Sequence, residues 1–223
     1  MRIVIVGTGT GIGKTHLGIA LVAAAARRGW SVAGLKPVES GVPADAPGED
    51  AAALAAASSF HVKHPQPYAL PDPVSPHLAA RRSGVTIDLD RIRRWVDDHH
   101  APWLFIETAG ALLSPLARGL TNLDLAAALT PDRWILVGVD RLGVLHEVTA
   151  CRLVLESRHI PPPVVILQSP PIPDTSTGTN AAELRFLGIA GDVFTMPRSA
   201  PLSDDSQQAA SVILDHLQSA PSR

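Results

Sequence analysis

Glycine, lysine and threonine near the N-terminus are spaced as in a loop that binds phosphate groups. Residues 7–15 read GTGTGIGKT and follow an apolar run, Arg2–Val6. Glycines let the backbone curl so that several amide N–H groups point at one anion, and a helix that starts there adds the positive end of its dipole. We therefore expect Lys14 to reach the outer phosphates of a nucleoside triphosphate and the Thr15 hydroxyl to hold Mg²⁺.

The loop departs from the strict P-loop pattern at one position. Glycine normally stands six residues before the lysine, where this chain has Thr8. A glycine-rich turn of the dinucleotide-binding type is the alternative, because Gly7, Thr8 and Gly9 begin like that fingerprint. The lysine–threonine pair at the helix start, and the lack of an acidic residue at the end of the second predicted strand, favour triphosphate binding.

Three charged residues stand where predicted strands end or a predicted helix begins. Lys36 follows the second strand and could stabilise charge that moves between a phosphoryl donor and an acceptor, although a solvated strand end is the simpler interpretation. Asp50 is either a further acid at this site or only the N-cap of the alanine-rich helix that follows it. Glu107 ends an apolar strand and resembles a Walker-B carboxylate, which would share Mg²⁺ with Thr15.

These residues need a scaffold, and the pattern of the chain predicts an α/β fold. Short apolar runs alternate with segments of helical period, which is typical of stacked βα units. The predicted strands are Arg2–Val6, Ser31–Leu35, Trp103–Ile106, Trp134–Val139, Val164–Leu167 and Asp192–Met196. We expect a doubly wound, mostly parallel sheet with helices on both faces, of the P-loop NTPase type. The length of 223 residues predicts a single nucleotide-binding domain over residues 1–223.

Local signals place several helices and one long loop. A helix should follow the glycine loop and end at Gly29, a second should be capped by Asp88, and others should begin at Asn180 and near Ser203. A further helix, from about Gly143 to Ser157, carries Cys151 on its apolar face, so this thiol is expected in the core. Prolines and glycines predict that Pro37–Gly48 is a long connecting loop.

Composition excludes several classes of protein. The formal net charge of −2 provides no basic field for a general nucleic-acid binder. Apolar runs fall short of the roughly 18 residues that span a bilayer, and the N-terminus lacks the regions of a signal peptide. One cysteine excludes an internal disulfide and a multi-thiolate metal site. We expect neither nucleic acid nor membrane as a partner, and a cytoplasmic location.

The order and spacing of these motifs resemble the dethiobiotin synthetase family over most of the chain. The segments that carry the resemblance are residues 7–15, Lys36–Gly41, Tyr68 with Pro73–His77, Glu107–Ala111 and Val137–Gly143. The resemblance implies ATP-dependent carboxylation and ring closure of 7,8-diaminononanoate with CO₂ to dethiobiotin. The reaction would pass through a carbamate and a carbamic–phosphoric anhydride, with Mg²⁺ as cofactor. Homodimers that complete each other's substrate sites are also implied.

The family's functional positions carry over onto this chain where the motifs match. By resemblance, the catalytic residues are Lys14, Lys36 and Thr10, and the metal is arranged by Thr15, Asp50 and Glu107. The diamine would contact Thr10, Lys36, Ser40 and Gly110. The implied nucleotide-binding residues are Gly9, Gly11, Ile12, Gly13, Lys14, Thr15, His16, Asp50, Glu107, Gly110, Gln168 and Pro197.

Several positions differ from the family pattern. Thr108 and Ala111 stand in place of glycines and add Cβ atoms where substrate and backbone approach. His146-Glu147 replaces an Asn-His pair that would contact the neighbour's substrate, and Gln168 replaces the asparagine that reads the base. Gly11 stands where the family usually has an acid.

Three other functions remain open from the sequence. A regulatory or partitioning ATPase would use the same loop as a switch, but usually carries a second lysine where this chain has Gly9. An amide-forming ligase would ordinarily need an ammonia source or a glutaminase domain. A nucleotide-binding relative that has lost catalysis is the third alternative, suggested by the departures at Thr108, Ala111 and His146-Glu147.

Overall fold

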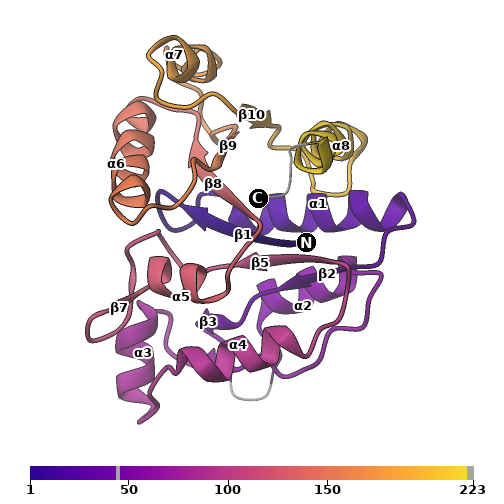
Figure 1. Ribbon diagram of the computed structural model, residues 1–223, viewed down its shortest axis with the longest axis vertical. Helices are drawn as coiled ribbons and strands as arrows, with labels where there is room; N and C mark the ends of the chain where they lie inside the picture. The colour runs from indigo at the N-terminus through magenta and orange to yellow at the C-terminus, as the bar shows by residue number, and fades with distance from the viewer. Residues whose placement is uncertain (44–45, 220–223) are drawn as a thin grey trace.

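A parallel sheet forms the centre of the molecule. The computed structural model describes residues 1–43 and 46–219. Within these residues, the main sheet has the strand order β10-β9-β8-β1-β5-β2 (Figure 1). Its strands are β1 (Arg2–Gly7), β2 (Val32–Leu35), β5 (Trp103–Glu107), β8 (Arg133–Val139), β9 (Val164–Gln168) and β10 (Val193–Met196). All six predicted strands are confirmed, and each differs from its predicted range by one residue at one end.

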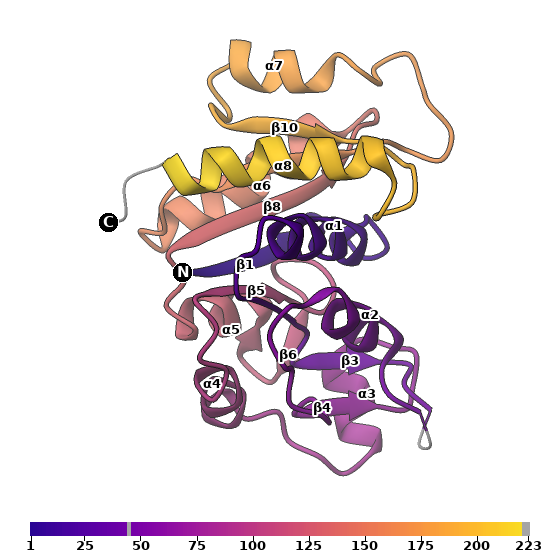
Figure 2. The same cartoon turned by 90° about the vertical axis from the view of Figure 1, so that its right-hand side faces the viewer.

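Helices cover both faces of this sheet. The helices are α1 (Lys14–Arg27), α2 (Glu49–Ala57), α3 (Pro76–Arg82), α4 (Leu89–Asp97), α5 (Asn122–Ala128), α6 (Val144–Ser157), α7 (Asn180–Phe186) and α8 (Asp204–Ser219). Figure 2 shows α1 and α8 side by side on one face. The fold class predicted from the sequence is confirmed.

Alternation along β1 divides the core between the two faces. Ile3 and Ile5 pack with apolar residues of α1 and α8, whereas Val4 and Val6 pack with residues of α4, α5, α6 and α7. Successive side chains of a strand point to opposite faces, so a continuous apolar run such as this one fits a strand that is covered on both sides. β1 lies between β5 and β8, and the chain therefore winds to both sides of the strand that precedes the glycine loop.

Most local signals for helices hold in the structure. The Asp88 side chain accepts a hydrogen bond from the amide of Asp90 and caps α4, as predicted. Helices begin at Asn180 and just after Ser203, and α6 ends at Ser157. Cys151 is partly buried against the core, and burial raises the pKa of its thiol to about 11, which keeps the thiol protonated and unreactive at neutral pH.

One prediction about a loop is wrong. Pro37–Gly48 contains a strand, β3 (Val38–Ser40), which pairs in parallel with β4 (Tyr68–Leu70). A strand of three residues is too short to show a period, and its partner lies far along the chain. A small antiparallel hairpin of β6 (Pro115–Ala117) and β7 (Leu120–Thr121), and the helices α3 and α5, were also not predicted. None of the helices in residues 1–43 and 46–219 is long and apolar enough to cross a membrane.

Candidate active site

The glycine loop joins β1 to α1 at the carboxyl edge of the main sheet. Gly13, with a φ of 91°, is the N-cap residue of α1, a left-handed conformation that glycine adopts without strain. The buried Lys14 side chain folds back over the loop, and its ammonium donates to the Gly9 carbonyl at 3.1 Å. Burial lowers the pKa of Lys14 to about 8, although the nearby carboxylate of Glu107 opposes the shift. Burial thus disfavours the ammonium form of Lys14, and an anion bound in the loop would stabilise that form.

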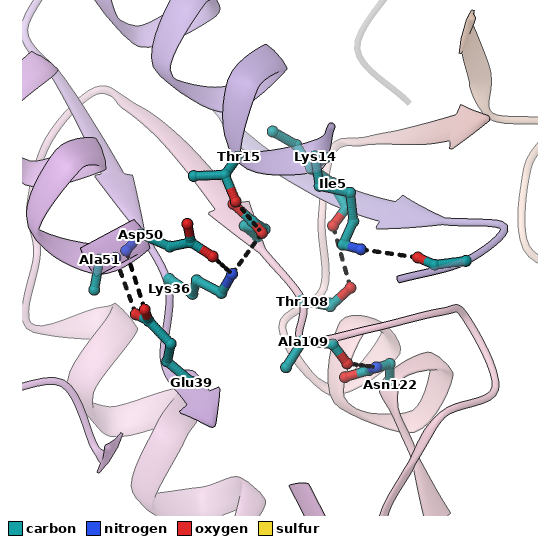
Figure 3. A network of polar contacts seen from close by, with 12 residues as sticks. Ile5, Lys14, Thr15, Lys36, Glu39, Asp50, Ala51, Thr108, Ala109 and Asn122 are labelled. Atoms are coloured by element: carbon teal, nitrogen blue, oxygen red, sulfur yellow. Dashed lines mark hydrogen bonds and ion pairs between the residues drawn. The ribbon is translucent and has the colours of Figure 1, made fainter. Parts of the chain in front are cut away.

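Beside the loop, Thr15, Lys36, Asp50 and Glu107 form one set of contacts, here called the charged cluster. Figure 3 labels Thr15, Lys36 and Asp50 and draws their contacts as dashed lines. β2 and β5 pair in parallel with Leu35 opposite Ile106, so the next residues, Lys36 and Glu107, leave the sheet at the same edge. The Lys36 ammonium donates to Glu107 Oε1 at 2.7 Å and also to the Asp50 carboxylate. The Thr15 hydroxyl donates to the same Glu107 oxygen at 2.8 Å.

Burial makes the charges of this cluster depend on one another. Only 8% of the Lys36 side chain and 2% of the Glu107 side chain are exposed. Burial lowers the pKa of Lys36, but the carboxylates of Glu107 and Asp50 outweigh it, so the pKa is raised and the ammonium is retained. Burial raises the pKa of Glu107, and Lys36 opposes that shift. The negative charge of Glu107 is thus supported by the lysine beside it.

The charged cluster has the ligands that Mg²⁺ prefers. Glu107 Oε2 is buried, and no group in the described part of the chain hydrogen-bonds to it. A buried carboxylate oxygen without a partner is costly unless a ligand or ion satisfies it. Among residues 1–43 and 46–219, no group of three or more His, Cys, Asp or Glu residues forms a metal site of its own. An ion here would therefore rely on Thr15, one or two carboxylates and the phosphates, which is the usual way that Mg²⁺ binds with nucleotides.

A cavity of about 450 Å³ opens between the glycine loop and the charged cluster on one side and the segment of residues 73–76 on the other. Its polar lining includes Thr10, Lys36, Ser40, Asp50, Gly110 and Ser114. We call it the large cavity, because it is the larger of two cavities beside the glycine loop. The Ser40 hydroxyl is buried and, within the described residues, has no hydrogen-bond partner. The large cavity thus presents hydroxyl groups to a polar ligand and brings that ligand directly against Lys36.

A smaller cavity, of about 260 Å³, lies on the opposite side of the loop. It is lined by Gly11, Ile12, Gly13, His16, Val139, Gln168, Ser169, Pro171 and Arg198. The Gln168 amide donates to the Gly13 carbonyl at 3.0 Å, and a ring nitrogen of His16 bonds to the Ser199 carbonyl at 2.7 Å. We call it the base cavity after the nucleobase that the family resemblance places near Gln168; its lining has no charged side chain except the exposed Arg198.

Comparison with known proteins decides the family. A protein-family model described as an AAA domain matches residues 1–196. The ATP-dependent dethiobiotin synthetase BioD of Anaeromyxobacter dehalogenans is 33% identical over 220 residues, which are 96% of this chain and 97% of the relative. The chain belongs to the dethiobiotin synthetase family. The corresponding protein of Nitrosospira multiformis is 37% identical over 161 residues, or 70% of each chain.

Solved structures agree on the fold. The cell division ATPase MinD of Pyrococcus furiosus matches with a TM-score of 0.59 at 15% identity, over 98% of this chain and 99% of that one. A ParA family ATPase from Chlorobium tepidum matches with a TM-score of 0.56 at 11% identity, over 98% and 92%. These identities show the P-loop ATPase fold alone. Membership of the dethiobiotin synthetase family makes the chain an ATP-dependent ligase.

The residues expected from the dethiobiotin synthetase pattern divide between the two cavities. Thr10, Lys36, Ser40, Asp50 and Gly110 line the large cavity, and Gly11, Ile12, Gly13, His16 and Gln168 line the base cavity. Thr15 and Glu107 line neither cavity but contact each other in the charged cluster, and Lys14 contacts Gly9 in the loop. Pro197 is not among the residues that line the base cavity, but its neighbour Arg198 is.

At two positions that differ from the dethiobiotin synthetase pattern, Thr108 and Glu147, the side chain makes contacts other than those expected. Thr108 is 1% exposed, and its hydroxyl donates to the Ile5 carbonyl at 3.2 Å, so its side chain lies against β1 and does not crowd the large cavity. Glu147 accepts a hydrogen bond from the Thr8 hydroxyl at 2.8 Å and pairs with Arg141 at 2.7 Å. In the described chain, Glu147 therefore connects the first turn of α6 to the glycine loop.

Sequence reasoning missed a role for Glu39 and Arg198, and one interpretation of Asp50 is wrong. The N-cap of α2 is Gly48, not Asp50, and the Asp50 side chain is free to reach Lys36. Glu39 is buried and lines the large cavity, although it was quoted only as part of a motif. The available signal was its place in the sequence between Lys36 and Ser40, two of the expected site residues.

Proposed function

We propose that this chain converts 7,8-diaminononanoate, CO₂ and ATP to dethiobiotin in biotin synthesis. The observation that carries the proposal is the placement of Lys36, which lines the large cavity and also contacts Glu107. Glu107 in turn accepts a hydrogen bond from the hydroxyl of Thr15 in the P-loop. A substrate in the large cavity and a triphosphate on the loop would therefore meet at one buried ammonium group. The names of the relatives support the same reaction.

The proposed chemistry requires no nucleophile from the protein. An amine of the substrate adds to CO₂ to give a carbamate, and a carbamate oxygen attacks the γ-phosphorus, which breaks the bond to the β-phosphate oxygen and releases ADP. The second amine then attacks the carbonyl carbon of the mixed anhydride, loses a proton to solvent and expels phosphate as the ring closes. The role of the chain is positioning and electrostatic stabilisation. Thr10, Ser40 and the backbone at Gly110 would hold the diamine next to Lys36.

Lys14 and Lys36 would stabilise the negative charge that spreads over the transferred phosphoryl group. Lys14 would leave its contact with the Gly9 carbonyl and reach the outer phosphates. Mg²⁺, held by Thr15 with Glu107 and Asp50, would neutralise charge on the β- and γ-phosphates when bound. The free Oε2 of Glu107 supports this assignment.

The base would occupy the base cavity, where Gln168 and the neighbouring backbone read its edge. Gln168 uses one amide N–H on the Gly13 carbonyl, so its second N–H and its amide oxygen would remain for the edge of a base. The names of the relatives, which are ATP-dependent dethiobiotin synthetases, support ATP as the triphosphate.

We infer further that residues 1–223 act as one nucleotide-binding domain and that the protein forms a homodimer in the cytoplasm, with no nucleic acid or membrane as partner. The dimer is implied by the family resemblance, with the start of α6 near the neighbour's substrate. A single cysteine with a protonated thiol is compatible with a reducing compartment.

The test is to mix the purified protein with the diamine, ¹³C-bicarbonate, Mg²⁺ and ATP, and to look by mass spectrometry for a labelled cyclic urea. We expect labelled dethiobiotin and one phosphate released per product, and no product when any component is omitted. ATP hydrolysis that does not require the diamine, with no urea formed, would instead favour a switch ATPase. Nucleotide binding with neither product would identify a relative that has lost catalysis.

A further inference from the structure

α2 begins without a side-chain cap from its own sequence. Its N-cap residue is Gly48, which has no side chain to accept a hydrogen bond from the first amides of the helix. The amides of Asp50 and Ala51 instead donate to the two carboxylate oxygens of Glu39, each at 3.0 Å (Figure 3). Glu39 lies on β3, so the cap of this helix comes from a different element of the fold.

The contact between Glu39 and α2 is a buried one. Glu39 is 7% exposed, and the two amides of α2 are its hydrogen-bond partners in the described chain. A buried carboxylate at the N-terminus of a helix is stabilised by these amides and by the helix dipole. The backbone fits closely around it, because a Cβ on Gly48 would lie 2.2 Å from Glu39 Oε2. Glycine at this position is what lets the carboxylate reach the helix.

Asp50, whose amide donates to Glu39, belongs to the charged cluster. Its amide is held by Glu39, while its carboxylate pairs with Lys36. The Asp50 side chain is 42% exposed, so the protein packs against it on one side only. The position of this carboxylate relative to Lys36 therefore depends on where the first turn of α2 is held, and Glu39 holds that turn.

We propose that Glu39 is a positioning residue, which sets the place of Asp50 beside Lys36 and the Mg²⁺–nucleotide. The proposal rests on the function proposed above, since it assumes that Asp50 serves a metal–nucleotide complex. Glu39 acts through Asp50 and touches neither the metal nor the phosphates. Residues that orient metal ligands in this way typically change metal affinity or activity by about 10–100-fold when they are substituted.

The test compares Glu39→Gln with the unsubstituted protein, using calorimetry with the β,γ-imido analogue of ATP, once in EDTA and once with Mg²⁺. We expect equal affinity in EDTA, and an affinity gain from Mg²⁺ that is about tenfold smaller in the variant, as typical of residues that orient metal ligands. Asp50→Asn should lose the same gain. The double variant should lose no more than Asp50→Asn alone, because both changes act on one group.

Asp88→Asn is the matched control, because the Asp88 carboxylate also caps a helix, α4, but lies outside the charged cluster. It should leave the Mg²⁺-dependent gain unchanged. Losses that multiply in the double variant, an equal loss in Asp88→Asn, or an unchanged gain in Glu39→Gln would each overturn the proposal. If Glu39→Gln does not fold, as judged by circular dichroism, Gly48→Ala provides a second way to displace the carboxylate and should give the same loss of gain.

The outcome is distinguishable from failure of the proposed function. The binding test requires the nucleotide and Mg²⁺ but no diamine, so it can succeed in a protein that makes no dethiobiotin. Conversely, formation of labelled dethiobiotin by the unsubstituted protein together with a normal Mg²⁺ response of Glu39→Gln would leave the function standing and overturn only the role of Glu39. A protein whose affinity for the analogue does not respond to Mg²⁺ would overturn the role of Glu39 as well.

Discussion

The charged cluster and the base cavity lie on opposite sides of one loop and are built from different interactions. In the charged cluster, Lys36 and Glu107 are almost fully buried and hold each other's charge at 2.7 Å. In the base cavity, Gln168 and His16 form hydrogen bonds with backbone carbonyls. Fixed charges with little access to water act strongly on charge that develops during a reaction, whereas neutral hydrogen bonds contribute modestly to affinity. We therefore expect substitutions in the charged cluster to lower turnover and substitutions in the base cavity to lower nucleotide affinity.

The largest effect should follow Lys36→Gln, which removes the ammonium at the centre of the charged cluster. We expect kcat for dethiobiotin formation to fall by about 10²-fold or more, as for other preorganised groups that stabilise a transition state. Part of the loss should come from Glu107, whose buried carboxyl loses the charge that favours ionisation. The measurement is steady-state product formation at saturating ATP. Lys63→Gln is the control, because the Lys63 side chain forms an exposed ion pair with Asp98, outside the charged cluster. A near-normal kcat in Lys36→Gln would contradict the role assigned to the charged cluster.

A smaller effect, of a different kind, should follow Gln168→Ala in the base cavity. Removal of one neutral hydrogen-bonding side chain costs on the order of 1 kcal/mol, or about fivefold in affinity. We expect this change in the KM for ATP, with kcat almost unchanged. Steady-state kinetics with ATP, GTP and CTP would also show whether discrimination between bases declines. A loss of kcat as large as that of Lys36→Gln would show that the two sides are not separate.

The smallest effect should be the uptake of a proton by Lys14, in the glycine loop, when a nucleotide binds. Because the pKa of Lys14 is lowered to about 8, only roughly one tenth of this lysine is protonated at pH 9 in the free protein. Bound phosphates favour the ammonium, so nucleotide binding at pH 9 should take up a proton, whereas binding at pH 6.5 should take up almost none through this group. Calorimetry in buffers of different ionisation enthalpy measures the uptake. Equal proton uptake at both pH values would contradict a lowered pKa at Lys14.

Much of the fold follows from local patterns. The strands of the main sheet are buried on both faces, so each reads as an apolar run that is visible without any partner. Capping by Asp88, the end of α1 near Gly29 and the glycine loop are likewise local, because a few adjacent residues determine the backbone there. β3 was missed for the opposite reason: its three residues are stabilised by pairing with β4, and nothing adjacent in the chain indicates that pairing.

By itself, the sequence determined the class of fold, the phosphate loop with Lys14 and Thr15, and the family to which the chain belongs. Only the tertiary structure decided that Lys36, Asp50 and Glu107 meet at one point, since this depends on β2 pairing with β5 and on where α2 starts. It also decided that Thr108 turns toward β1 and that Glu39 caps a helix formed by a later part of the chain. Local backbone preferences act over a few residues, whereas contacts between charged side chains depend on which distant segments become neighbours when the core packs.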